Sequence, residues 1–145
     1  DMKRKIGEGE NYLQSRVLEM IRDIMGIIIE NRETTVTKIT FLSNKEADVE
    51  IGIKTPEVLD EESGFFEKNI GKRVDEEYIK KYGEMPESSK VKKSSKAEQK
   101  KVMDRLDSVA KEVIKNSIRN KKVSYHILNG KLRVVKSNDG WKVRG

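Results

Sequence analysis

Residues 123–143 read VSYHILNGKLRVVKSNDGWKV, and two alternating apolar runs lie on either side of Asn129-Gly130. A two-residue type I′ turn requires positive φ at both central residues, and an Asn-Gly pair adopts that conformation most easily. The stretch therefore predicts a β-hairpin whose turn is Asn129-Gly130. With a two-residue loop, Tyr125 would face Val134 across the ladder.

The register of this hairpin sorts its side chains between two faces, because neighbouring residues of a strand point to opposite sides. The buried face is expected to hold Val123, Tyr125, Ile127, Leu132 and Val134. The outer face is expected to hold Ser124, His126, Leu128, Lys131, Arg133 and Val135, with His126 opposite Arg133. A second turn signal, Ser137-Asn138-Asp139-Gly140, leads into Trp141, which is interpreted as a structural residue.

A further hairpin is predicted upstream. Residues 34–42 are rich in β-branched and aromatic side chains, and apolar and polar residues alternate strictly in residues 47–53. Ser43-Asn44-Lys45 joins the two runs. Thr55-Pro56 ends the second run, because proline donates no hydrogen bond to a ladder. The residues expected to share the buried face with those of the last hairpin are Ile39, Phe41, Val49 and Ile51.

Two long helices are predicted from apolar spacing. From Tyr12 to about Asn31, apolar residues recur at intervals of three or four, which gives one stripe along a helix. Ser95 to Glu98 has the pattern of a capping box, in which the serine oxygen accepts from a free N–H group. The apolar stripe that follows this box ends near Asn120.

Three segments have weaker patterns. Residues 1–9 show no apolar period and are expected to form a flexible arm. Residues 57–93 contain apolar residues near helical spacing, so one or two short helices are expected, with Gly71 and Gly83 as stops. Residues 86–95 are charged and serine-rich, and they are expected to form a flexible loop.

Length and composition limit the class of protein. One domain over residues 10–145 is expected in a chain of 145 residues. The absence of cysteine excludes a disulfide scaffold, thiolate metal sites and a cysteine nucleophile. No run of about 18 apolar residues occurs, so neither a membrane span nor an intact signal peptide is expected. Because the chain opens with Asp1-Met2, an upstream segment such as an export signal is expected to have been removed.

The order of elements predicts an α+β fold: helix, hairpin, helical insert, long helix and hairpin. One antiparallel sheet of two hairpins, apolar on one face, would be wrapped by the long N-terminal helix and the helical insert. This order, with Thr55-Pro56 closing a strand and Gly140-Trp141-Lys142-Val143 in the last one, resembles the cystatin-like domains of the nuclear-transport-factor-2-like superfamily. Within that group the chain is most similar to small lipoproteins of bacterial envelopes.

The resemblance implies a curved sheet that holds a long helix in its concavity. It also implies export, and a lipid anchor through a cysteine that this chain does not contain. An extracellular or cell-envelope location follows, with the cytoplasm as the alternative. Enzymes of the superfamily place an aspartate, tyrosine or histidine set in a cone-shaped cavity, and no such set can be assigned here.

No catalytic set, metal site or cofactor is predicted. His126 is the only histidine, and its expected place beside Arg133 suits a surface residue. The carboxylates with suitable spacing, Asp48 with Glu50 and Asp104 with Asp107, are interpreted as solvated surface groups. The candidates for lining a ligand cleft between sheet and helix are the aromatic residues Tyr12, Phe41, Tyr125 and Trp141, although aromatic residues at such positions more often serve core packing.

The net charge of +6 permits an anionic partner. The candidate contacts to a polyanion are Lys90, Lys92, Lys93 and Lys96, followed closely by Lys100 and Lys101. No aromatic side chain is interleaved with them, which disfavours nucleic-acid binding by base stacking, and a solubilising loop is the plain alternative.

Three classes of function stay open. The first is a non-catalytic envelope or extracellular module that binds an unknown protein or small ligand, or that has a structural role. The second is a basic protein that binds polyanions or nucleic acid. The third is an enzyme that uses the cavity of the fold.

Overall fold

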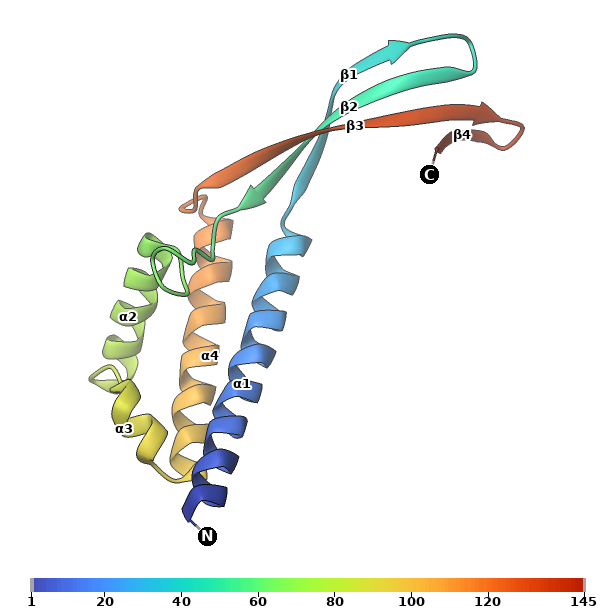
Figure 1. The fold of residues 1–145 in the computed structure, drawn as a ribbon. Helices are drawn as coiled ribbons and strands as arrows, with labels where there is room; N and C mark the ends of the chain where they lie inside the picture. Colours follow the sequence, from blue (N-terminus) through green and yellow to red (C-terminus); the bar gives the residue numbers. More distant parts are fainter. Residues whose placement is uncertain (1, 145) are drawn as a thin grey trace. The chain divides into compact units, whose positions relative to one another are not determined.

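The computed structural model describes residues 2–144, with side chains from residue 12 onwards. Along the chain the elements are α1 (Met2–Glu30), β1 (Glu33–Phe41), β2 (Glu46–Pro56), α2 (Lys68–Tyr82), α3 (Ser88–Lys93), α4 (Lys96–Arg119), β3 (Tyr125–Ser137) and β4 (Gly140–Val143) (Figure 1). The fold is α+β, and its four strands form one antiparallel sheet in the order β1-β2-β3-β4.

The chain divides into two compact units, where the sequence analysis expects a single domain. The helical unit comprises residues 1–30 and 57–123, and therefore contains all four helices. The sheet unit comprises residues 31–56 and 124–145, and therefore contains the four strands.

The helical unit contains the hydrophobic core. Each of α1, α2 and α4 has one apolar stripe, and these stripes pack together. The buried members of the core are Met20, Ile24, Ile27, Ile28, Val58, Ile70, Val74, Tyr78, Val109, Ala110, Val113 and Ile114. The stripes predicted for the two long helices are confirmed at Ile24 and Ile114, which are fully buried.

α1 begins at Met2, well before the predicted start at Tyr12. Residues 2–9, for which the sequence analysis predicts a flexible arm, are helical. Once a helix is nucleated, each added residue forms one more backbone hydrogen bond, so a helix can extend through polar residues that have no apolar period. The stripe that begins near Tyr12 therefore marks where the helix packs and not where it starts.

α2 begins and ends at clear sequence signals. The Glu67 carboxylate accepts hydrogen bonds from the N–H groups of Asn69 and Ile70, at 3.0 and 3.1 Å. Gly83 ends the helix with φ at 95°, a conformation that residues with a Cβ atom rarely adopt. Gly83 is therefore the stop that was predicted, whereas Gly71 lies inside the helix.

Residues 88–93 form the short helix α3, and the prediction of a loop there is wrong. The Nε2 atom of Gln99, a residue of α4, donates to the carbonyl oxygens of Val91 and Lys92 at 3.1 and 3.4 Å. The bond to Lys92 satisfies a carbonyl group that the end of a helix leaves unpaired, whereas the Val91 oxygen also accepts from the N–H and hydroxyl groups of Ser94. A contact from the next helix therefore stabilises α3, whose own sequence has no apolar period, and the mobility of residues 86–95 stays a prediction.

α4 begins at the predicted cap. Ser95 Oγ accepts a hydrogen bond from the N–H group of Glu98 at 3.2 Å. The helix ends at Arg119, next to the predicted end at Asn120. α4 packs against α1, α2 and α3, so it is the central helix of its unit.

β3 is one continuous strand, and the hairpin predicted at Asn129-Gly130 is wrong. Asn129 lies opposite Gly52 of β2, and Gly130 lies opposite Ile51. If β3 folded back on itself at this pair, half of β2 would lose the partner for its backbone hydrogen bonds. The ladder that runs along all of β2 therefore overrides the local turn signal.

The continuous strand also changes which residues share a face. Residues an odd number of positions apart point to opposite sides of a strand. Tyr125 and Ile127 therefore lie on one side of the sheet, and Leu132 and Val134 lie on the other. The predicted common buried face of these four residues is wrong.

The other predicted turns are confirmed. β1 and β2 form a hairpin in which Phe41 faces Ala47, and β2 ends at Pro56. Gly140, with φ at 107°, closes the turn between β3 and β4, where Ser137 Oγ donates to the Gly140 carbonyl at 3.0 Å. β4 pairs with the last residues of β3 alone, so most of the outer edge of β3 is not covered by β4.

Candidate functional site

One face of the sheet is apolar. Residues paired across neighbouring strands share a face, so the register assigns each side chain to one side. The apolar residues on this side are Val36, Ile39, Phe41, Ala47, Val49, Ile51, Ile53, Leu128, Leu132, Val134, Trp141 and Val143. This set, which we call the apolar face, draws on all four strands.

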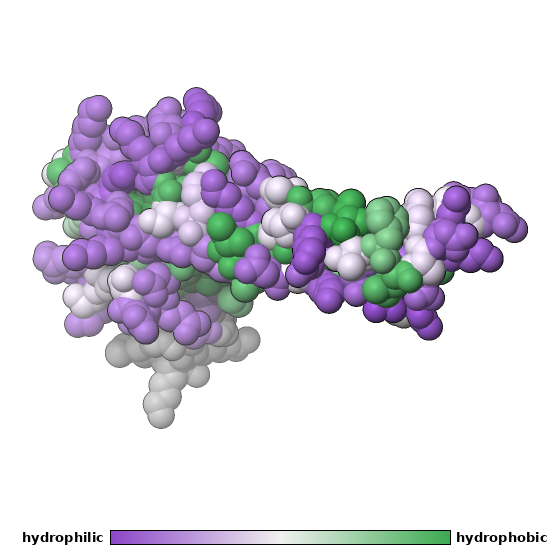
Figure 2. All heavy atoms as spheres, turned by 90° about the horizontal axis from the view of Figure 1, so that it is seen from above, coloured by the Kyte–Doolittle hydropathy of each residue, from purple (hydrophilic) through white to green (hydrophobic). Residues whose placement is uncertain are grey.

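Much of the apolar face is exposed. Phe41 is 68% exposed, Ile39 53% and Trp141 44%, and the exposed set also includes Val36, Leu128, Leu132 and Val143. The predicted burial of Ile39, Phe41 and Leu132 is therefore wrong, and so is that of Ile127, which is 62% exposed on the opposite face. Alternation shows which residues share a face, but it does not show whether another layer covers that face. Figure 2 shows hydrophobic residues, in green, open at the surface of the sheet.

A β-bulge brings the first strand into phase with the apolar face. The register of β1 against β2 shifts between Val36 and Lys38, which makes Thr37 the extra residue. Thr37 Oγ1 donates to the carbonyl oxygen of Glu50 at 3.1 Å, which holds the bulge in place. Without the extra residue, Val36 and Ile39 would point to opposite sides. The bulge therefore adds Val36 to the apolar face.

Two aromatic residues that are distant in sequence meet on the apolar face. The ring centroids of Phe41 and Trp141 lie 6.2 Å apart with their planes at 63°, which is an edge-to-face contact. Phe41 belongs to β1 and Trp141 to β4, the two outer strands of the sheet. This aromatic pair therefore reaches across the sheet from one edge to the other.

The opposite face of the sheet is charged. Arg133 Nε donates to Asp48 Oδ1, and Lys131 Nζ lies 3.6 Å from Asp48 Oδ2. The hydrogen bond from Arg133 holds the pKa of Asp48 below its usual range, and the same bond raises the pKa of Arg133. Glu46 Oε2 lies 3.6 Å from Arg133 Nη1. A face of this composition is stable in water, so the apolar face is the candidate site.

Tyr125 does not belong to the aromatic pair. It lies on the charged face, where Lys54 Nζ is 4.5 Å from its ring centroid. Tyr125 therefore cannot line one cleft with Phe41 and Trp141. The fourth aromatic candidate, Tyr12, belongs to α1 in the helical unit, and Lys96 Nζ is 5.4 Å from its ring centroid.

His126 lies opposite Thr55 on the same side as the apolar face, and its predicted place opposite Arg133 on the outer face is wrong. The side chain is exposed. In the register of the described strands, no Asp or Glu lies on this side of the sheet. The register therefore supplies no carboxylate beside His126 to orient it as a general base.

The carboxylates Asp104 and Asp107 of α4 form an ion-pair network with α1. Asp107 Oδ2 accepts from Arg16 Nη2 at 3.0 Å and from Lys111 Nζ at 3.1 Å. Arg16 also donates to Asp104 at 3.3 Å, and Lys111 to Asp23 at 2.8 Å. Asp107 is buried, so its interpretation as a solvated group is wrong. The bond with Asp107 raises the pKa of Arg16, and the bond with Lys111 lowers the pKa of Asp23.

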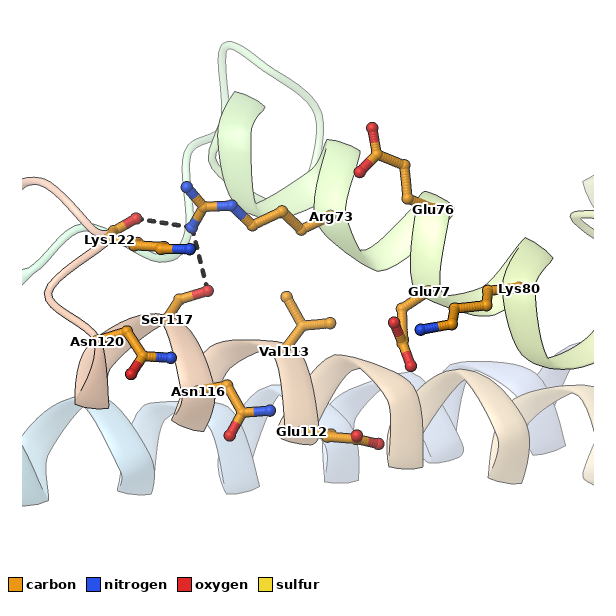
Figure 3. Close-up of a pocket in the computed structure, with 10 residues that line it drawn as sticks. All are labelled: Arg73, Glu76, Glu77, Lys80, Glu112, Val113, Asn116, Ser117, Asn120 and Lys122. Carbon is orange, nitrogen blue, oxygen red and sulfur yellow. Dashed lines mark hydrogen bonds between the residues drawn. The ribbon is translucent and has the colours of Figure 1, made fainter.

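A polar groove with a volume of about 360 Å³ lies between α2 and α4 (Figure 3). Arg73 Nη1 donates to Ser117 Oγ at 3.1 Å and to the carbonyl oxygen of Lys122 at 2.7 Å, so protein groups already hold this guanidinium. The charged residues that line the groove are Arg73, Lys80, Lys122, Glu76, Glu77 and Glu112. Because both signs are equally represented, the groove favours neither an anion nor a cation.

A second groove, of about 330 Å³, is lined by residues of α2, α3 and α4. The ring centroids of Tyr78 and Tyr82 lie 4.9 Å apart, and the guanidinium carbon of Arg105 lies 4.4 Å from the centroid of Tyr82. Arg105 therefore occupies a ring face that a ligand would otherwise contact. Packing within the helical unit explains these aromatic residues.

The lysine candidates Lys90, Lys92 and Lys93 lie on α3, and Lys96 begins α4. All four are exposed. Lys90 Nζ lies 3.7 Å from Glu87, so part of its charge is offset within the same turn. The structure therefore gathers the cluster at the junction of two helices, where the sequence analysis places a flexible loop.

The sequence alone places Leu128 on the outer face, and it assigns no face to several other members of the apolar face, Val36 among them. Leu128, Leu132 and Val134 point to one side of the sheet only if the strand continues through Asn129-Gly130. This even-numbered series is the signal that could have identified Leu128. The signal for Val36 is absent, because a bulge cannot be read from alternation.

Within residues 2–144, no three His, Asp or Glu side chains come together as a group that could hold a metal ion. Over the same described range, none of the helices combines the length and the apolar character that crossing a membrane requires. The chain matches no protein-family model, no curated protein and no solved structure.

Proposed function

We propose that this chain is a non-catalytic binding module that acts through the apolar face of its sheet. The supporting observation is that side chains as large as Phe41 and Trp141 are exposed there together with aliphatic residues from every strand. A contiguous apolar surface of this kind marks a site of protein interaction more often than a solvated surface. The partner is accordingly a protein with an apolar surface of its own.

The proposal includes the cystatin-like form of the fold and a location outside the cytoplasm, in the cell envelope or the extracellular space. Both rest on the resemblance of the last strand, with its Gly140-Trp141-Lys142-Val143 ending. Fractionation of cells that express the full-length gene product tests the location. Recovery in the cytosol alone would contradict this part of the proposal and leave the role of the apolar face untouched.

The non-catalytic character is supported by the state of the ionisable groups. Asp48 and Asp104 are engaged in ion pairs with arginine and lysine side chains, and these pairs lower the pKa of both carboxylates. Such pairing holds a carboxylate in its charged form and opposes its use as a proton donor near neutral pH.

Photo-crosslinking tests the binding role. p-Benzoylphenylalanine is placed at Phe41, on the apolar face, and at Tyr125, on the charged face, which gives a matched pair of aromatic positions. We expect a crosslinked product on a denaturing gel from the Phe41 position and none from Tyr125. Products of equal yield from both positions, or from neither, would refute the proposal.

A second function is favoured by one observation. Residues 88–101 contain six lysines and one acidic residue, and they lie on α3 and the first turns of α4. Such a cluster can contact a polyanion through its phosphate or carboxylate groups. We expect binding to inorganic polyphosphate that weakens with added salt, and loss of that binding when Lys92 and Lys93 are both changed to Gln. Lys136→Gln, on the sheet, is the control.

A further inference from the structure

We infer that the apolar face is covered by the apolar face of a second copy of this chain, in a two-fold symmetric sheet-on-sheet dimer. The inference rests on the proposed function, because it names the partner for the same surface. Three properties favour a copy of this chain as the occupant: the charge of the face, its area and the exposure of the apolar side chains in the sheet unit.

The apolar face is compatible with itself in charge. Its register contains no Asp or Glu, and its ionisable side chains are His126 near the start of β3 and Lys136 near the end. The centre of the face therefore has no charge that a copy would repel. Stacking two such faces leaves the charged sides, with Asp48 and Arg133, in water on the outside of the dimer.

The area of the face reaches what a specific dimer needs. β2 has 11 residues, which corresponds to a length of about 37 Å at the usual rise of a strand. Strands of 9, 11, 13 and 4 residues at a spacing of about 4.8 Å give a face of about 600 Å², so two copies would bury about 1,200 Å². That value is the lower limit for specific interfaces, and it indicates a reversible dimer.

A second copy would also cover the apolar side of the sheet at all times. In the sheet unit, the buried apolar side chains of the described strands are those of Ala47 and Pro56 alone. A sheet with an apolar side is stable when another layer packs on it, and two antiparallel sheets stack at about 10 Å with their strands roughly aligned. A copy of the chain is present whenever the chain is present, which is not true of a transient partner. In a two-fold dimer each copy contributes the same surface.

Sedimentation equilibrium of the whole chain across the micromolar range tests the inference. We expect a monomer–dimer equilibrium in which Ile39→Asp raises the dissociation constant by at least about a hundredfold, because the change places two carboxylates in an apolar interface. The matched control is Thr35→Asp, on the same strand but on the charged face. Circular dichroism checks that both variants keep the helical content of the wild type.

The outcomes separate this inference from the proposed function. A dimer that Ile39→Asp dissociates and Thr35→Asp does not supports both. A wild-type monomer that crosslinks a different protein from the Phe41 position overturns the inference and supports the proposed function. A wild-type monomer without crosslinks overturns both. A dimer that only Thr35→Asp dissociates overturns the inference, since its interface would lie on the charged face.

Discussion

The helical unit and the sheet unit are both built from amphipathic elements, but they differ in what happens to the apolar sides. In the helical unit the stripes of α1, α2 and α4 meet each other, and Ile24, Ile70 and Ile114 are inaccessible to water. In the sheet unit the apolar sides of all four strands point the same way, and residues such as Phe41 are exposed. Similar amphipathic patterns therefore form a buried core in the helical unit and an exposed apolar surface in the sheet unit.

The difference shows that an amphipathic pattern specifies which residues form an apolar surface, but not which other element or molecule packs on that surface. Helices that carry apolar stripes can bury them against one another in pairs. A single sheet cannot do this, because pairing its strands places their apolar residues on a common side. An exposed apolar side of a sheet therefore indicates a surface that a partner can cover. A buried stripe of a helix is already covered by the other helices of its own unit.

The largest expected effect comes from removing a core side chain of the helical unit. We expect Ile24→Ala to destabilise the chain by about 2–5 kcal/mol, because the substitution leaves a cavity among fully buried neighbours. Ile39→Ala removes the same atoms from the sheet and should cost less than about 1 kcal/mol in the monomer. Urea unfolding at low protein concentration measures both. Equal losses would mean that the sheet has a core of its own.

The next effect concerns the network that joins α1 to α4. Asp107→Asn should cost about 1.5–3 kcal/mol, because Arg16 and Lys111 lose the charged acceptor that they share. Asp139→Asn, at the exposed turn beside Lys142, is the control and should change stability by less than about 0.5 kcal/mol. Thermal unfolding distinguishes the two. A neutral Asp107→Asn would show that the helices are held by apolar packing alone.

Trp141→Ala should have an intermediate effect of about 1 kcal/mol in the monomer, from the loss of the edge-to-face contact with Phe41. The sequence analysis expects a structural tryptophan, for which full burial would give a loss of about 3–5 kcal/mol. Its 44% exposure argues for the smaller value. If the dimer forms, the cost should grow with protein concentration, and unfolding curves at several concentrations measure this dependence.

The smallest expected effect is the pH response of the charged face. The hydrogen bond from Arg133 lowers the pKa of Asp48 below 3.8, its ordinary value. The folded state therefore gains stability above the unfolded pKa, and it loses that gain as the pH falls through the lower folded value. We expect Asp48→Asn to flatten the decline of stability below pH 3.8, as urea midpoints would show. An unchanged slope would assign acid sensitivity to other carboxylates, such as Asp23.

Local signals in the sequence predict the parts of this fold that local interactions determine. Ser95 caps α4, Gly83 ends α2, and Gly140 closes the last turn, each as its residue type indicates. Asn129-Gly130 has an equally strong local signal and does not form a turn, because the competing ladder with β2 comes from residues far away in the sequence. α3, whose own residues have no apolar period, accepts hydrogen bonds from Gln99 of the next helix.

The apolar face could be predicted only in part from the sequence. The alternation in β1 and β2 correctly places Ile39 and Phe41 on one side with Val49 and Ile51. The exposure of that side and the contribution of Leu128 depend on the pairing of β2 with β3 and on what lies above the sheet. Neither the exposure of the face nor the contribution of Leu128 can be predicted from the order of residues along one strand.

The ladder between β2 and β3 has a consequence for the order of folding. Its closest pair in sequence, Pro56 and Tyr125, is separated by α2, α3 and α4. Closing so long a segment costs conformational entropy before any of the cross-strand bonds form, and contacts of this kind slow folding. The segment from 57 to 123 should therefore become helical first and shorten the effective distance between the strands. In stopped-flow refolding, the far-ultraviolet helical signal should precede the change in Trp141 fluorescence, and the reverse order would mean that the sheet initiates folding.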